Sequence, residues 1–241
     1  MNINTKVNTM NKILVLILSS LFSLTACGGF LGSKTIADNT EAPNKDYDTV
    51  NGSIKVGHNA NVGDLSTVNG SVKVASSSKV GSAETVNGSV VFEEDVSAKS
   101  AETVNGSIKL GANCNIEEDT ETVNGSITAN SRCNIGGNFQ TVNGKLTAID
   151  TEIHGNVEAV NGTILLLDGT IVHDDIIIKK NKGFFNKNKK KPVVVLGKNV
   201  VVKGDIEFGR DVKLYIHDSV DIDDDIENAE ITRFSGDEKP Y

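Results

Sequence analysis

Apolar residues recur along most of this chain at a spacing of six positions. Near Asn51, for example, Ile54, Val56 and Val62 stand among polar and small residues, and the two valines are six positions apart. A longer period accompanies this one, because Val-Asn-Gly recurs seven times, with successive Asn residues 18, 18, 18, 19, 19 and 18 positions apart. These are Asn51, Asn69, Asn87, Asn105, Asn124, Asn143 and Asn161. Each repeat therefore holds three six-residue segments.

The length of the repeat predicts strands rather than helices. Helices shorter than about 12 residues are marginal, so two of them do not fit into 18 residues. Three short strands joined by tight corners do fit, and parallel stacking places equivalent residues about 4.8 Å apart. We therefore predict an all-β fold, a triangular single-stranded parallel β-helix (β-solenoid) with about ten coils of 18–19 residues. An aromatic content of only 5% agrees with burial by repetition rather than in a conventional core.

The Val-Asn-Gly signature is expected to form a corner of each coil. Glycine accepts a positive φ angle at such a corner, and the Asn side chains of successive coils can hydrogen-bond in a ladder. A column of threonines beside the signature predicts a second ladder. It consists of Thr49, Thr67, Thr85, Thr103, Thr122 and Thr141.

Short motifs within the coils resemble two known groups of proteins. Residues 56–61 and 62–67 look like the hexapeptide repeats of left-handed β-helices, which are often acyltransferases. The Val/Ile-x-Gly-x-Ile/Val pattern of residues 50–54, 153–157 and 202–206 looks more like bactofilins, which are polymer-forming right-handed β-helices. We expect a right-handed coil.

The N-terminus has the features of an export signal. Lys6 and Lys12 precede an apolar run at residues 13–24, which is too short to span a bilayer. The sequence then reads Leu-Thr-Ala-Cys, ending at Cys27, and resembles the lipobox of bacterial lipoproteins. That resemblance implies removal of residues 1–26 and lipidation of Cys27. Gly28 replaces the Asp that tends to retain such proteins at the inner membrane, so we expect a lipid-anchored envelope protein at the outer membrane.

The residue pattern divides the chain after residue 26 into five segments. We predict a flexible tether at 27–47, the solenoid at 48–178, a Lys-rich inserted loop at 179–192, further coils at 193–231 and a tail at 232–241. The insertion offers a basic, aromatic-tipped contact for anionic lipid or polyanions, or is simply a solvated loop. Its residues are Lys179, Lys180, Lys182, Phe184, Phe185, Lys187, Lys189, Lys190 and Lys191.

Cys114 and Cys133 each follow their own coil's Asn by nine positions, so they should lie in adjacent coils. That separation suits a disulfide in an oxidising compartment. The alternative is two small apolar side chains filling one column. The true start of the chain is either Met1 or Met10.

No catalytic, metal or cofactor site is predicted. His58, His154, His173 and His217 share no column when repeats are counted from Asn, and no column of carboxylates is evident. At residues 149–157 the spacing slips, so that Ile153 is expected to take the core position in place of His154. The acidic run at 221–227 lacks the spacing of a calcium loop.

A formal charge of -8, or -10 once residues 1–26 with their two Lys are removed, disfavours nucleic acid as a partner. We expect a non-enzymatic envelope structural or interaction protein that contacts an envelope protein, a polysaccharide or its own copies. The alternative is an acyltransferase or a carbohydrate-active enzyme.

Overall fold

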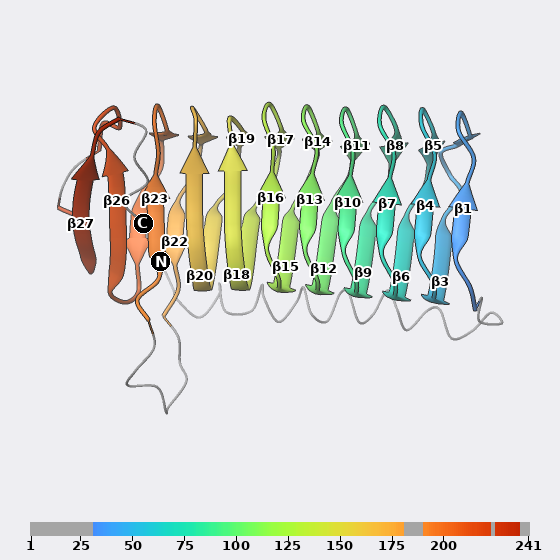
Figure 1. Cartoon of the computed structure of the whole chain (residues 1–241), viewed down its shortest axis with the longest axis horizontal. Coiled ribbons are helices and arrows are strands. Elements are labelled where there is room, and N and C mark those ends of the chain that lie inside the picture. The colour runs from blue at the N-terminus through green and yellow to red at the C-terminus, as the bar shows by residue number, and fades with distance from the viewer. Residues whose placement is uncertain (1–30, 181–189, 223–224, 237–241) are drawn as a thin grey trace.

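The protein is an all-β rod, seen from the side in Figure 1. The computed structural model describes residues 31–180, 190–222 and 225–236. The described residues contain no helix and form a parallel β-solenoid of about 11 turns. Accordingly, no described segment is a helix long and apolar enough to cross a bilayer. The predicted fold class is confirmed, while its right-handed sense stays a prediction.

Each coil contributes strands at three positions. Strands at the first position lead into the signature corner. Those of the signature coils are β3 (Tyr47–Asn51), β6 (Leu65–Asn69), β9 (Ala83–Asn87), β12 (Ala101–Asn105) and β15 (Thr120–Asn124), and those of later coils, which lack the signature, are β22 (Ile176–Ile178) and β25 (Ile206–Phe208). Strands at the second position are β1 (Lys34–Ile36), β4 (Ile54–Val56), β7 (Val72–Val74), β10 (Val90–Phe92), β13 (Ile108–Leu110), β16 (Ile127–Ala129), β23 (Val193–Leu196), β26 (Val212–His217) and β27 (Ala229–Phe234). In two coils the first and second strands run on as one, giving β18 (Phe139–Ile149) and β20 (Val157–Leu167).

Two-residue strands occupy the third position and form a separate parallel sheet. They are β2 (Glu41–Ala42), β5 (Asn61–Val62), β8 (Lys79–Val80), β11 (Ser97–Ala98), β14 (Asn115–Ile116), β17 (Asn134–Ile135), β19 (Glu152–Ile153), β21 (Ile171–Val172) and β24 (Val201–Val202).

The core is a set of aligned apolar columns. Because side chains alternate across a strand, every second residue points inward, as in β13, where Ile108 and Leu110 are buried around exposed Lys109. The column through Ile108 is fully buried in nine successive coils, from β4 to β26, and ends at the partly buried Ile231 of β27. Its fully buried members are Ile54, Val72, Val90, Ile108, Ile127, Leu146, Ile164, Val194 and Leu214.

The solenoid begins earlier than predicted. β1 pairs with β4 and β2 with β5, and Leu31 forms a bridge to Asn51. The flexible tether predicted for residues 27–47 is therefore wrong from residue 31 onward. The cause is that this coil lacks the signature but keeps the six-residue spacing, with Ile36 and Ala42 six positions apart.

The signature glycines do not have the predicted backbone conformation. Only Gly32, Gly169 and Gly236 have a positive φ among the described glycines. At Gly106 a Cβ would overlap the carbonyl oxygen of Gly88 in the preceding coil, and the other signature glycines meet the same obstacle. Glycine is therefore required at this corner by the close approach of stacked backbones.

Nine of the ten described non-glycine residues with a positive φ lie at a different corner, two or three residues before each third-position strand, and the tenth, Asn228, directly precedes β27. The nine residues at this corner are Asn39, Asn59, Ser77, Asp95, Asn113, Arg132, Asp150, Asp168 and Asn199. Most are Asn or Asp, the non-glycine residues that best tolerate this conformation.

The threonine column is buried, but its hydroxyls do not bond to one another. Thr103 Oγ1 donates to the carbonyl oxygen of Gly88 at 2.9 Å, and Thr85 Oγ1 to that of Gly70 at 2.8 Å. The predicted threonine ladder is therefore wrong. Each hydroxyl instead bonds to the glycine carbonyl of the preceding coil.

The asparagine ladder is confirmed. From Asn69 to Asn161, each signature Nδ2 donates to the Oδ1 of the preceding signature Asn at 2.9 to 3.0 Å. The residue columns thus remain in register along this corner for seven coils.

Breaking one rung should have a modest effect. Asn105 donates to Asn87 and accepts from Asn124, and all three are exposed, so we expect Asn105→Ala to lower the free energy of unfolding by about 1 kcal/mol. Thermal unfolding followed by circular dichroism measures this. Lys109→Ala, an exposed change in the next strand, should stay within about 0.5 kcal/mol. If the two variants unfolded at the same temperature, the ladder would make no contribution to the free energy of unfolding.

Candidate functional site

A slip in the repeat brings together two histidines that were expected to lie apart. The coil that starts at Asn143 reaches the core position of its third strand after ten residues, at Ile153, whereas the next coil needs eleven, from Asn161 to Val172. Ile153 is fully buried, as predicted. Because Ile153 pairs with Val172, His154 and His173 become neighbours on the outer face of the third sheet. The prediction that the histidines share no column is therefore wrong for this pair.

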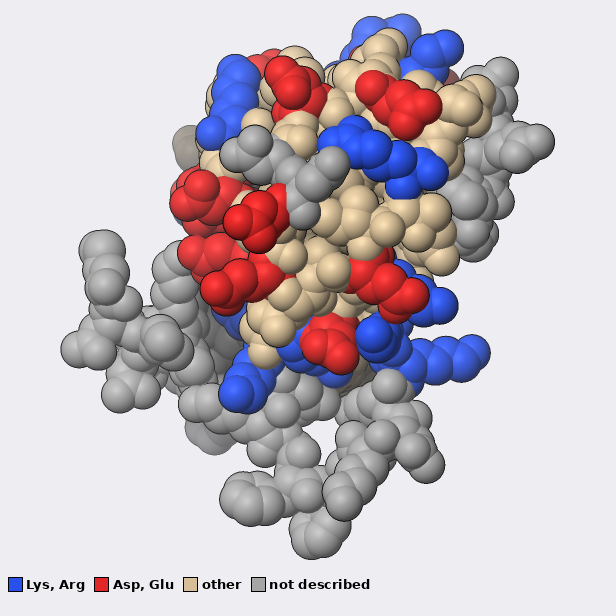
Figure 2. All heavy atoms as spheres, turned by 90° about the vertical axis from the view of Figure 1, so that its left-hand side faces the viewer, with Lys and Arg blue, Asp and Glu red and all other residues tan. Residues whose placement is uncertain are grey.

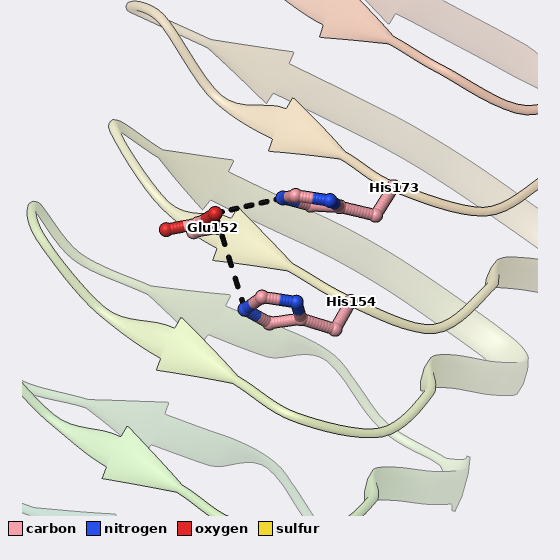
Figure 3. Close-up of side chains that lie close together, drawn as sticks. All are labelled: Glu152, His154 and His173. Carbon is pink, nitrogen blue, oxygen red and sulfur yellow. Dashed lines mark hydrogen bonds and ion pairs between the residues drawn. The ribbon is translucent and has the colours of Figure 1, made fainter.

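The two imidazoles and Glu152 form a compact cluster, drawn in Figure 3. The rings of His154 and His173 are stacked, with their centroids 4.5 Å apart and their planes at 19°. Glu152 Oε1 lies 2.7 Å from His173 Nε2 and 3.9 Å from His154 Nε2. One ligand atom from each residue falls within 4.8 Å of the other two.

Side chains from the flanking coils orient the cluster. Asn134 Nδ2 donates to Asn115 Oδ1 at 2.8 Å, which turns Asn134 Oδ1 towards His154 Nε2, 3.0 Å away. On the other side, Lys203 Nζ lies 3.3 Å from His173 Nδ1. The cluster thus extends a polar row that crosses five coils, from β14 to the coil of β24.

The exposed position of this cluster suits the binding of a ligand or ion at the surface rather than catalysis in an enclosed site. Side-chain exposure is 43% for His154, 47% for Glu152 and 28% for His173, so water reaches all three. Two imidazoles and a carboxylate are donors that late first-row metal ions accept. The residues of this cluster are also the described ones best suited to hold a metal.

The Lys-rich insertion occupies the place of the signature corner between β22 and β23. Lys182, Phe184, Phe185, Lys187 and Lys189 lie outside the described residues. At the ends of the insertion the charge is already partnered. Lys179 pairs with Glu158, while Lys191 lies 3.7 Å from Asp211 and 3.4 Å from Glu230. Lys180 and Lys190 are exposed.

The next coil bridges the gap that the insertion leaves at this corner. Arg210 stands where the signature would lie, and its Nη2 donates to the carbonyl oxygen of Val160 at 2.9 Å. Burial lowers the pKa of Arg210. This hydrogen bond to Val160 therefore joins the coil before the inserted segment to the coil after it.

Cys114 and Cys133 lie at equivalent positions of adjacent coils, immediately before the paired strands β14 and β17. Both are buried and unbridged. Cys114 Sγ donates to the carbonyl oxygen of Glu93 at 3.2 Å, and Cys133 Sγ to that of Gly111 at 3.0 Å. Hydrogen bonding to Cys114, together with burial, raises the pKa of the Cys133 thiol. The two thiols thus fill one column of the solenoid.

A row of carboxylates follows the first sheet, although the repeats had suggested none. Glu84, Glu102 and Glu121 pair in register on β9, β12 and β15. Burial, then repulsion from Glu84, raises the pKa of Glu102 to about 7; burial, then repulsion from Asp119, raises the pKa of Glu121 to about 9. A carboxyl with a raised pKa suits acid–base catalysis, but these residues line neither the hollow at Asp205 and Asp221 nor the one at Glu93 and Asn130.

The acidic run near the C-terminus lies at the end of the rod. Asp221, Asp225 and Glu227 line a shallow hollow together with Asp205 and Glu207. Figure 2 looks onto this end and shows acidic side chains gathered along one flank. Residues 223 and 224 lie outside the described residues. The remaining histidines are separate from the cluster: His58 bonds to Ser76, and His217 to Ser219.

Comparison of the chain with protein-family models, with curated proteins and with solved structures finds no match. A function for the chain is therefore inferred from its fold and its side-chain geometry.

Proposed function

We propose that this chain is a lipid-anchored, non-enzymatic protein of the cell envelope that presents a rigid β-solenoid as a structural or interaction surface. The single observation that carries the proposal is the in-register rod itself. Seven signature corners are joined by the Asn ladder, and the described columns repeat polar groups along flat faces rather than around a cleft. Repeats of this kind supply extended binding surfaces.

The position of the first coil bears on how the rod would sit. Leu31 already pairs with the solenoid, and only three residues separate it from Cys27. An extended chain spans at most about 3.5 Å per residue, so lipidation of Cys27 would hold the first coil within roughly 14 Å of the bilayer surface. About 11 coils at ~4.8 Å each would then carry the last coil some 50 Å from the first.

The partner is proposed to bind along the faces rather than at the ends. The C-terminal hollow carries Asp205 and Asp221, and the first coil carries Asp38 and Glu41, which are exposed. If copies stacked end to end, these exposed carboxylates would repel one another, and salt would screen the repulsion. Single rods that contact an envelope protein or a polysaccharide are therefore favoured over end-to-end filaments.

Replacing the proposed anchor tests this function. In bacteria fed a palmitate analogue, the wild-type chain should take up the label and migrate as the form without residues 1–26. The Cys27→Ser variant should carry no label and keep its leader, because serine lacks the sulfur atom to which the lipid is attached. Cys114→Ala serves as the matched control and should be labelled as the wild type is. Label on the Cys27→Ser variant would refute anchoring at this residue.

A further inference from the structure

The proposed function does not depend on the cluster of Glu152, His154 and His173. Glu152 and His154 flank Ile153 in β19, and His173 follows Val172 in β21. The backbones of these two strands pair in register. The spacing of the two histidines is therefore set by the sheet, and a site built on a rigid sheet is preorganised.

The separations in this cluster suit a bound metal ion once the side chains rotate. Metal–nitrogen bonds of about 2.0–2.1 Å and metal–oxygen bonds of about 2.0–2.2 Å place tetrahedral ligands roughly 3.3–3.5 Å apart. Glu152 Oε1 is closer than this to His173 Nε2, at 2.7 Å, and further from His154 Nε2, at 3.9 Å. Binding also requires the stacked imidazoles to rotate until their in-plane lone pairs converge on one point, which displaces His154 Nε2 from Asn134 Oδ1. The exposed side chains of Glu152 and His154 have room for this rotation.

We propose that Glu152, His154 and His173 bind one divalent ion of the late first-row transition series, such as Zn²⁺ or Cu²⁺. Imidazole nitrogen favours these ions, whereas Ca²⁺ and Mg²⁺ require more oxygen ligands than Glu152 supplies. Three protein ligands leave a further coordination position for water or for a donor from a partner. The ion would also link the coils of β19 and β21.

Lys203 is expected to weaken this site. An ammonium group only donates hydrogen bonds, so at 3.3 Å from His173 Nδ1 it holds that nitrogen as an acceptor and leaves the proton on Nε2, where it is donated to Glu152. A metal on Nε2 requires the proton on Nδ1 instead. Histidines that bind metal usually donate this second N–H to an acceptor. An acceptor in place of Lys203 should therefore tighten binding.

Calorimetric titration of the metal-free full chain in detergent with Zn²⁺ tests the proposal. The wild type should bind about one equivalent, and His154→Gln and His173→Gln should each weaken binding about ten-fold or more. Lys203→Gln should strengthen it several-fold. His58→Gln, which removes a histidine from a distant coil, should leave it unchanged, and titration with Ca²⁺ should show no binding.

The proposal is overturned if the wild type binds no Zn²⁺, or if both cluster variants keep its affinity. Unchanged affinity in Lys203→Gln would contradict Nε2 as the ligand atom of His173. A second measurement needs no variant: electron paramagnetic resonance of the Cu²⁺-loaded wild type should show two coordinated nitrogens, and a spectrum without nitrogen coupling would contradict the site. These results are independent of lipidation at Cys27.

Discussion

Gly125→Ala should destabilise the protein by about 3 kcal/mol or more, the upper range for a single substitution. A Cβ at this position would overlap the carbonyl oxygen of Gly106 in the preceding coil and lie 2.6 Å from its carbonyl carbon. Both atoms are backbone, so no side chain can rotate away. Relief requires the two coils to separate, which also lengthens the Thr122 to Gly106 hydrogen bond of 3.1 Å.

Thermal unfolding by circular dichroism, with a matched glycine as control, measures the effect. Gly197→Ala places its Cβ 2.9 Å from Leu167 Cδ2, the movable end of a side chain, and 3.1 Å from the Leu166 carbonyl oxygen. We expect that variant to lose only about 1 kcal/mol, the usual size of a single-substitution effect. If Gly125→Ala unfolds at the wild-type temperature, the signature glycine is not required by close stacking.

Phe139→Ala should cost about 3–5 kcal/mol, as is typical of removing a fully buried aromatic ring. Phe139 begins β18 and has no exposed surface. Its column contains Thr120 in the preceding coil and Val157 in the following one. These smaller side chains are fixed by the paired backbones on either side, so they cannot close the cavity.

The control for this variant lies in the same strand. Lys145 is exposed, and Lys145→Ala should change the free energy of unfolding by less than about 0.5 kcal/mol. The two variants are compared by thermal unfolding. A Phe139→Ala protein as stable as Lys145→Ala would mean that the apolar columns do not pack against one another.

The fold could be predicted because each signature coil repeats the same spacing of apolar residues. Register in a stacked array depends on equal spacing, and seven copies of Val-Asn-Gly show the spacing directly. The first coil was missed because it has no signature. Its only sequence signal is the six-residue step from Ile36 to Ala42, which is too short to separate a coil from a linker.

The reason for the signature glycine could not be predicted from the sequence. A positive φ and a close backbone contact both select glycine, and only the structure shows that stacking against the preceding coil is the cause here. The threonine hydroxyls present the same difficulty, because a column of threonines fits bonds to one another as well as bonds to glycine carbonyls.

The histidine cluster was missed for a different reason. The coil after Asn143 is one residue short before its third strand, so positions counted from the signature Asn separate His154 from His173. Aligning the coils on Ile153 and Val172 instead would have placed both histidines directly after a core residue. A local deletion of one residue thus moves side chains between columns without disturbing the core.

The measurement that tests the central claim most directly is the distance between spin labels placed along one outward column. Lys55, Thr147 and Tyr215 belong to that column, five and eight coil steps along it from Lys55. In a chain with Cys27, Cys114 and Cys133 replaced by Ala, labels at 55 and 147 should lie about 24 Å apart, and labels at 55 and 215 about 38 Å apart. A distance that grows in proportion to the coil count is the predicted result. If the 55–215 pair were no further apart than the 55–147 pair, the in-register rod would be contradicted.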